Sequence, residues 1–141
     1  MVTVTLVLLL TYAMPAARRL AAGGLTIFLD GTIVHFTAVR ASEPGAFTPE
    51  LGLRVVQDPW LRAGMQVGFP IVTLFELLSP LCLFHRAFRR VWIVVIAGFH
   101  IMSWLTMGIF FWANLLMIVF FVTDMDRILA RWRRPPEPAL M

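Results

Sequence analysis

Four ionisable residues interrupt otherwise apolar stretches of the sequence: Asp30, His35, Glu76 and His100. Charged or titratable side chains are costly at membrane depth, so each is a candidate for function. Asp30 precedes Gly31, and its other interpretation is a helix cap or break close to an interface. For His35 the other interpretation is a ring at the outer headgroup level, a zone that this side chain tolerates.

Glu76 and His100 are the two candidates that could act together. Glu76 lies ten residues before Arg86, and His100 lies ten residues after Arg90. Neighbouring antiparallel helices would bring the two to a similar depth, where a hydrogen bond between them would stabilise both. The pair is then either a structural polar clamp between helices or a site that handles protons or contacts a quinone or a lipid headgroup.

Aromatic residues follow His100 and could line a site for a pigment or a quinone tail. The candidates for cofactor contact are His100, Trp104, Phe111 and Trp112. Such a stripe is also typical of lipid-facing or core packing. Asn114 is expected to be a structural polar residue. No metal site is expected, because the three histidines, at 35, 85 and 100, lack the spacing of zinc ligands.

The composition indicates a membrane protein. Hydrophobic residues make up 60% of the chain and charged residues only 14%, against about 25% charged in soluble domains. All twelve basic residues are arginines, and they cluster at the ends of apolar runs, as topology signals do. This pattern argues against nucleic-acid binding. The absence of lysine excludes a lysine base or Schiff base, and the single cysteine, Cys82, excludes an internal disulfide.

The apolar runs predict an all-α, polytopic integral membrane bundle of about five spans. The run from Val91 to Thr123 has 33 residues, or roughly 50 Å as one helix, which exceeds a hydrocarbon core of about 30 Å. It is therefore divided near 106–108 into a helical hairpin. The expected spans are residues 2–16, 20–39, 61–84, 91–106 and 108–124.

The arginine clusters set the expected orientation. The positive-inside rule places three clusters on the cytoplasmic side: Arg18-Arg19, Arg86 to Arg90 and Arg127 to Arg134. Residues 40–60 then form an external loop, with a short interfacial helix from Leu51 to Gln57. The N-terminus is expected outside and the C-terminus in the cytoplasm of a bacterial inner membrane. Residues 1–134 form a single transmembrane domain, and residues 135–141 a disordered tail.

Several short motifs resemble the HTTM (horizontally transferred transmembrane) domain, the membrane region shared with vitamin K-dependent gamma-carboxylases. The resemblance covers Leu20 to Asp126. Its residues are Phe75-Glu76-Leu77-Leu78-Ser79-Pro80, the basic turn from His85 to Arg90, Phe99-His100 and Met107-Gly108-Ile109-Phe110, with Ala22-Gly23-Gly24-Leu25 and Asp30-Gly31-Thr32 as a degraded upstream motif.

This resemblance implies a shared membrane scaffold, with Glu76 and His100 at family-type positions. Full family members carry further spans before this region, so the chain is expected to correspond to their later half. The carboxylases use a lysine base after the upstream motif, and this sequence has no lysine. Gamma-glutamyl carboxylation is therefore not expected.

The function expected from the sequence is that of a non-catalytic integral membrane accessory subunit. It would pack against other integral membrane subunits of a respiratory or photosynthetic complex and contact lipid, quinone or pigment. The alternative is an enzyme, or half of a split enzyme, that acts through Glu76 and His100 on a lipid-soluble substrate such as a quinone. A transporter ranks below both, because the sequence shows no repeated halves.

Overall fold

The computed structural model describes residues 2–43 and 48–119. Within these ranges every regular element is helical, which confirms the predicted all-α class. The elements are α1 (Val2–Gly23), η1 (Thr26–Phe28), α2 (Thr32–Ala41), α3 (Pro49–Gln57), α4 (Pro59–Leu77), η2 (Ser79–Leu83), α5 (Arg86–Met107) and α6 (Trp112–Met117).

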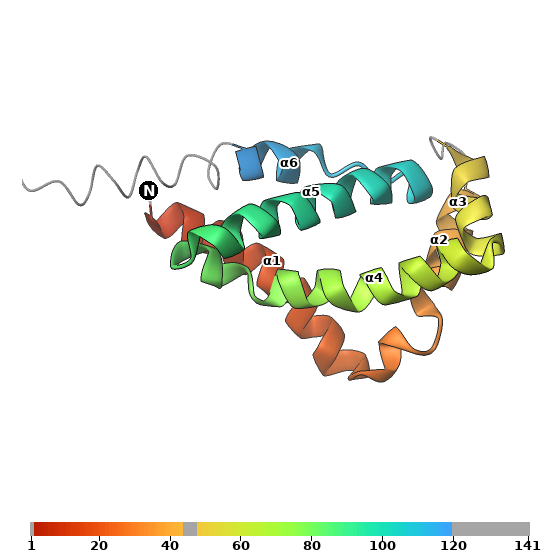
Figure 1. Ribbon diagram of the computed structural model, residues 1–141, viewed down its shortest axis with the longest axis horizontal. Coiled ribbons are helices and arrows are strands. Elements are labelled where there is room, and N and C mark those ends of the chain that lie inside the picture. The colour runs from red at the N-terminus through yellow and green to blue at the C-terminus, as the bar shows by residue number, and fades with distance from the viewer. Residues whose placement is uncertain (1, 44–47, 120–141) are drawn as a thin grey trace, which may run out of the picture.

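Two long helices, α4 and α5, run in opposite directions along the length of the molecule (Figure 1). At one end, η2 connects them and α1 packs beneath. At the other end, α2 and α3 lie across them and contact both. The framework is therefore a pair of antiparallel helices, α4 and α5, held together by η2 at one end and by α2 and α3 at the other.

Local sequence signals set the ends of α4 and α5. The Asp58 side chain accepts hydrogen bonds from the backbone N–H groups of Trp60 and Leu61, at 2.9 and 3.0 Å, so it caps the start of α4. Gly108 ends α5 with a φ of 68°, a left-handed conformation that glycine adopts without strain. The predicted break at 106–108 is confirmed at this residue.

The buried core lies where α1, η2 and α5 meet. Leu9, Cys82, Trp92 and Ile96 are fully buried there. The Tyr12 ring meets Trp92 edge to face, with centroids 5.2 Å apart. Hydrogen bonds add to this packing: Ser79 of η2 donates to the Leu9 carbonyl of α1 at 2.6 Å, and Trp92 Nε1 of α5 donates to the Phe75 carbonyl of α4 at 3.0 Å.

The first two expected spans differ from the helices observed. α1 is one helix that continues through Pro15 and the two arginines expected to end it, as far as Gly23. The chain then turns at Gly24 and Gly31, both with positive φ, so residues 20–39 do not form a single helix. Inside α1, Arg19 is paired with Glu76 of α4, so this arginine does not mark the end of a helix at the membrane surface.

The later expected spans overlap the observed helices, but of the described helices in this part only α5 is long and apolar enough to cross a membrane. Residues 61–84 divide into α4 and η2, because the chain changes to a 3-10 turn around Pro80. α5 begins at Arg86, five residues before the expected 91. The helix expected at Leu51–Gln57 is confirmed as α3. α6 lies in the expected span 108–124, of which residues 120–124 are outside the described part, as are the tail 135–141 and the last arginine cluster.

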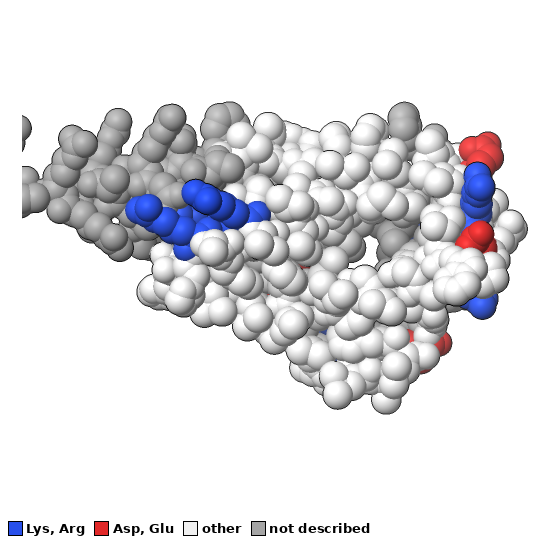
Figure 2. Space-filling model, viewed as in Figure 1, with Lys and Arg blue, Asp and Glu red and all other residues white. Residues whose placement is uncertain are grey.

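Two of the described helices, at Thr3–Gly23 and Arg86–Met107, are long and apolar enough to cross a membrane. Charged side chains gather at the two ends of the face in Figure 2, with an uncharged band between them. The exposed arginines Arg86 and Arg90 begin α5, and Glu43, Glu50 and Arg54 are exposed in the segment expected as the external loop.

Candidate functional site

A cleft of about 440 Å³ lies between α4 and α5. This volume is within the range typical of small-molecule sites, roughly 300–1,000 Å³. Figure 2 shows the surface hollowed between these helices. α4 contributes Leu61, Gly64, Met65, Gly68, Phe69 and Val72, and α5 contributes Phe99, Met102, Ser103, Thr106 and Met107.

Two glycines on α4, which have no side chains, leave the cleft open. Gly64 and Gly68 are one helical turn apart and both line it. A Cβ added at either glycine would meet nothing within 4 Å. A Gly-x-x-x-Gly spacing usually lets two helix backbones come close. Here no described residue fills the space, so the same spacing widens the cleft.

Contacts at the far end hold the two walls in place. The Thr48 hydroxyl donates a hydrogen bond to the Leu105 carbonyl, which ties the start of α3 to α5. Gly52 of α3 packs against the carbonyl of Thr106, and a Cβ on Gly52 would also come within 2.6 Å of the Ala41 Cβ. α3 can lie across the end of α5 because this position has no side chain.

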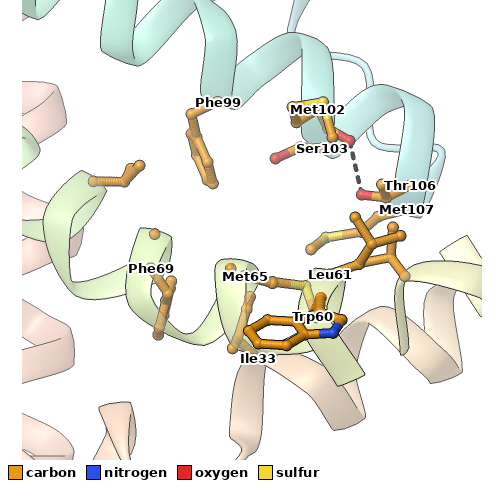
Figure 3. Close-up of a pocket in the computed structure, with 14 residues that line it drawn as sticks. Ile33, Trp60, Leu61, Met65, Phe69, Phe99, Met102, Ser103, Thr106 and Met107 are labelled. Carbon is orange, nitrogen blue, oxygen red and sulfur yellow. Dashed lines mark hydrogen bonds between the residues drawn. The ribbon is translucent and has the colours of Figure 1, made fainter. Parts of the chain in front are cut away.

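The cleft is lined by flexible and aromatic apolar groups. Three methionines and two phenylalanines face it, and Met65, Phe69, Phe99, Met102 and Met107 are seen around the space in Figure 3. Methionine side chains adapt to ligands of varied shape. No charged or titratable residue is among the described residues that line it. The lining suits an uncharged, lipid-soluble molecule.

Glu76 does not pair with His100, contrary to the hydrogen bond expected from the sequence. It is 5% exposed and forms an ion pair with Arg19 of α1. Arg19 also donates a hydrogen bond to the hydroxyl of Thr73 at 3.2 Å, and its guanidinium lies 5.5 Å from the centroid of the Phe69 ring. Glu76 faces α1, which the sequence did not place beside α4.

His100 lies on a neighbouring face of α5, among aromatic rings. It is 3% exposed, and its ring centroid lies 4.9 Å from that of Phe111, 5.6 Å from Phe99 and 5.9 Å from Tyr12. Neither ring nitrogen makes a hydrogen bond with any residue that the structure describes. Phe99 lines the cleft and contacts His100, whereas His100 itself is not among the lining residues.

Asp30 and His35 lie away from the cleft, near the α2 end of the molecule. Asp30 is exposed, and its carboxylate accepts a hydrogen bond from the backbone N–H of Thr32 at 2.9 Å. Hydrogen bonds from the Thr32 side chain and backbone lower the pKa of this carboxyl. His35 is exposed beside a second, shallow recess that Arg62 and Gln66 also line. The Asp30 side chain therefore bonds the first backbone N–H of α2, beside the N-cap residue Gly31.

The other residues expected to contact a cofactor do not line the cleft. Trp104 packs on Phe110, with centroids 5.0 Å apart, and Trp112 is 59% exposed. Phe111 packs on His100, outside the cleft lining. The backbone carbonyl of Asn114 accepts a long hydrogen bond, 3.4 Å, from the Tyr12 hydroxyl.

Sequence reasoning missed the residues that shape the cleft. The sequence analysis did not single out Gly64, Gly68 or Ser103 as candidates. Only the two glycines could have been found from a pattern, through their Gly-x-x-x-Gly spacing. The residues described contain no group of three His, Cys, Asp or Glu side chains that could hold a metal ion.

Comparison with protein-family models, with curated proteins and with solved structures finds no match to this chain.

Proposed function

We propose that the protein is an integral membrane protein that binds a lipid-soluble molecule in the α4–α5 cleft. The observation that carries this proposal is the cleft itself, with its volume of about 440 Å³ and its apolar lining. Apolar sites of this kind bury most of a ligand's surface and orient it through a few polar groups. In a membrane, ligands that dissolve in lipid reach such a site from the bilayer.

The protein is proposed to be non-catalytic. General acid–base chemistry needs a titratable group within hydrogen-bond reach of the substrate. The described lining has no such group, and Glu76, the buried carboxylate nearest in sequence to the α4 wall, is neutralised by Arg19. The cleft is suited to holding a molecule and has no evident means of transforming it.

The membrane arrangement follows the charge distribution. Large apolar side chains face outward from the long helices; Val94 is 71% exposed and Val67 is 61% exposed. Such side chains suit contact with lipid. We place the exposed Arg86 and Arg90 on the cytoplasmic side by the positive-inside rule, and α3 on the outer side. Because α1 begins at the same end as α5 (Figure 1), this proposal places its start on the cytoplasmic side, in contrast to the external N-terminus expected from the sequence.

In this proposal the protein is an accessory subunit of a larger membrane complex. Its lipid-facing helices would pack against other integral subunits, and the bound molecule would be a lipid, a quinone or a pigment at the boundary. The likeness of the segment around Glu76 and of Phe99-His100 to the HTTM scaffold is part of the same proposal, without the carboxylation chemistry.

The test is to identify what the protein carries out of the membrane. The chain is purified in nanodiscs, and the extract is analysed by mass spectrometry. The wild type is expected to retain a lipid-soluble molecule at about one per chain. Gly68→Leu fills the cleft and should lose this molecule. Gly98→Leu, which adds the same side chain at an open position on α5, should retain it.

Two results would defeat the proposal. One is that the wild type retains no molecule other than the lipids that also copurify with Gly68→Leu and Gly98→Leu. The other is equal retention by Gly68→Leu and the wild type when circular dichroism shows both folded. Copurification of other membrane subunits in stoichiometric amounts tests the accessory role separately.

The second candidate function is an enzyme, or half of a split enzyme, that uses His100 on a quinone. The observation in its favour is a buried imidazole with no hydrogen-bond partner among the described residues. If the protein is such an enzyme, the isolated protein should turn over an added quinone. This activity should be lost in His100→Phe and kept in Gly98→Leu. Absence of turnover by the wild type excludes it.

A further inference from the structure

Ser103 is the one hydroxyl-bearing residue of the cleft lining whose side chain has no partner among the described residues. Its hydroxyl group points into the cleft between Phe99 and Thr106 (Figure 3). The residue is only 3% exposed. The hydroxyl group makes no hydrogen bond to a described residue, so an acceptor inside the cleft would stabilise it.

The other helical hydroxyls show what Ser103 lacks. Thr37, Ser42 and Thr106 each donate to the backbone carbonyl four residues earlier, at 2.7 to 2.8 Å. This local bond is the usual one for serine and threonine within apolar helices. The Thr106 bond to the Met102 carbonyl is drawn in Figure 3. Ser103, one turn away on the same wall, makes no such bond to a described residue, so its donor is available to a molecule in the cleft.

The rest of the lining restricts the chemistry of that molecule. No arginine or histidine lines the cleft among the described residues, so a carboxylate or phosphate would be buried without a counter-charge, which is strongly unfavourable. Around Ser103 the walls are apolar. A single uncharged acceptor on an apolar body matches this arrangement.

We propose that Ser103 donates a hydrogen bond to the oxygen of a neutral lipid bound in the α4–α5 cleft. The ligand class is an uncharged molecule with one hydroxyl or carbonyl oxygen on an otherwise apolar body. Ser103 is then the residue that distinguishes such a lipid from a hydrocarbon. This inference rests on the proposed function of the cleft.

The experiment compares three radiolabelled probes with the same carbon chain: hexadecane, hexadecanol and palmitate. Binding to the protein in nanodiscs is measured above the signal of the cleft-filling variant Gly68→Leu, or of Gly64→Leu if the first does not fold. The wild type is expected to bind hexadecanol about fivefold more tightly than Ser103→Ala does, as one hydrogen bond allows. Hexadecane should bind both proteins equally. Because each probe is compared between proteins, its partition into lipid cancels.

The matched control is Ser42→Ala, which removes a serine hydroxyl outside the cleft, one that bonds to the Ala38 carbonyl at 2.8 Å. It should bind all three probes as the wild type does. If no probe binds the wild type above the cleft-filled variant, the proposed function fails. If the probes bind but Ser103→Ala keeps full affinity for hexadecanol, only this inference fails. Preferential binding of palmitate also overturns it, because the ligand would then be an anion.

Discussion

The ion pair between Glu76 and Arg19 joins α4 to α1 in apolar surroundings. Removing only the cation in Arg19→Met leaves the buried carboxylate with no counter-charge. Since Arg19 is partly exposed and Glu76 is not, we expect a loss of about 2 kcal/mol in the free energy of unfolding, between the values for exposed and fully buried pairs. Unfolding in mixed detergent micelles measures it.

The control is the double variant Arg19→Met/Glu76→Met, which removes both charges. It should recover most of the lost stability, because no unpaired charge remains. A double variant no more stable than Arg19→Met would show that the two side chains do not interact.

His100 gives a second prediction about a single residue. Its ring nitrogens are buried without hydrogen bonds to described residues, among the rings of Tyr12, Phe99 and Phe111. His100→Phe keeps a ring of similar size and removes the unsatisfied polar atoms. We expect it to raise the free energy of unfolding by about 1 kcal/mol, measured in the same micelles. A decrease would mean that the imidazole has a polar partner.

At this scale the sequence predicted the burial of two polar residues but not what they contact. The apolar context of Glu76 and His100 predicted their burial, and both are buried. Their predicted pairing was wrong, because residue depth along two helices does not determine which faces point at each other. Arg19 lay in a cluster assigned to the membrane surface, so it was not considered as a partner for Glu76.

Among the helices, the contact of α3 with α5 depends on Gly52. A methyl group there would meet the Thr106 carbonyl and the Ala41 side chain. Gly52→Ala should therefore lower the free energy of unfolding by about 2 kcal/mol, as overpacking does. The same change at Gly98, an open position on α5, should raise it by about 0.5 kcal/mol, because alanine favours helix. Thermal unfolding compares the two, and similar effects at both positions would be inconsistent with the close packing of α3.

The helices that the sequence predicted best are those with local end signals. Gly108 ends α5 at the expected break, and α3 occupies the expected stretch of the loop. The first expected span ended at residue 16, but α1 continues through Pro15, because a proline inside an apolar helix can be tolerated when other groups satisfy the freed backbone. Whether that happens depends on tertiary contacts, which a local pattern does not contain.

In the whole molecule, charges at both ends of an apolar band predict which parts face each side of a membrane. In a background with Cys82→Ala, Ser42→Cys should react with an impermeant maleimide in intact cells. Arg86→Cys should react only in inverted vesicles. Val94→Cys, on the apolar outer face, should react in neither. Labelling of Ser42→Cys and Arg86→Cys from the same side would refute the proposed orientation.

The cleft is a property of the whole molecule, and the sequence could not reveal it. Its walls come from α4 and α5, and the separation of these walls depends on η2 at one end and on α2 and α3 at the other. The spacing of Gly64 and Gly68 is compatible with a close helix pair or with an open cleft. Only the positions of the neighbouring helices decide between the two.

The most direct test of ligand binding in the cleft is photolabelling with a diazirine-bearing alkyl chain, followed by peptide mapping. The predicted result is crosslinking to cleft residues on both α4 and α5, such as Met65 and Met102, which is abolished in Gly68→Leu and kept in Gly98→Leu. Crosslinks spread equally over the outward faces, for example at Val67 and Val94, and unchanged in Gly68→Leu, would contradict the proposed binding site.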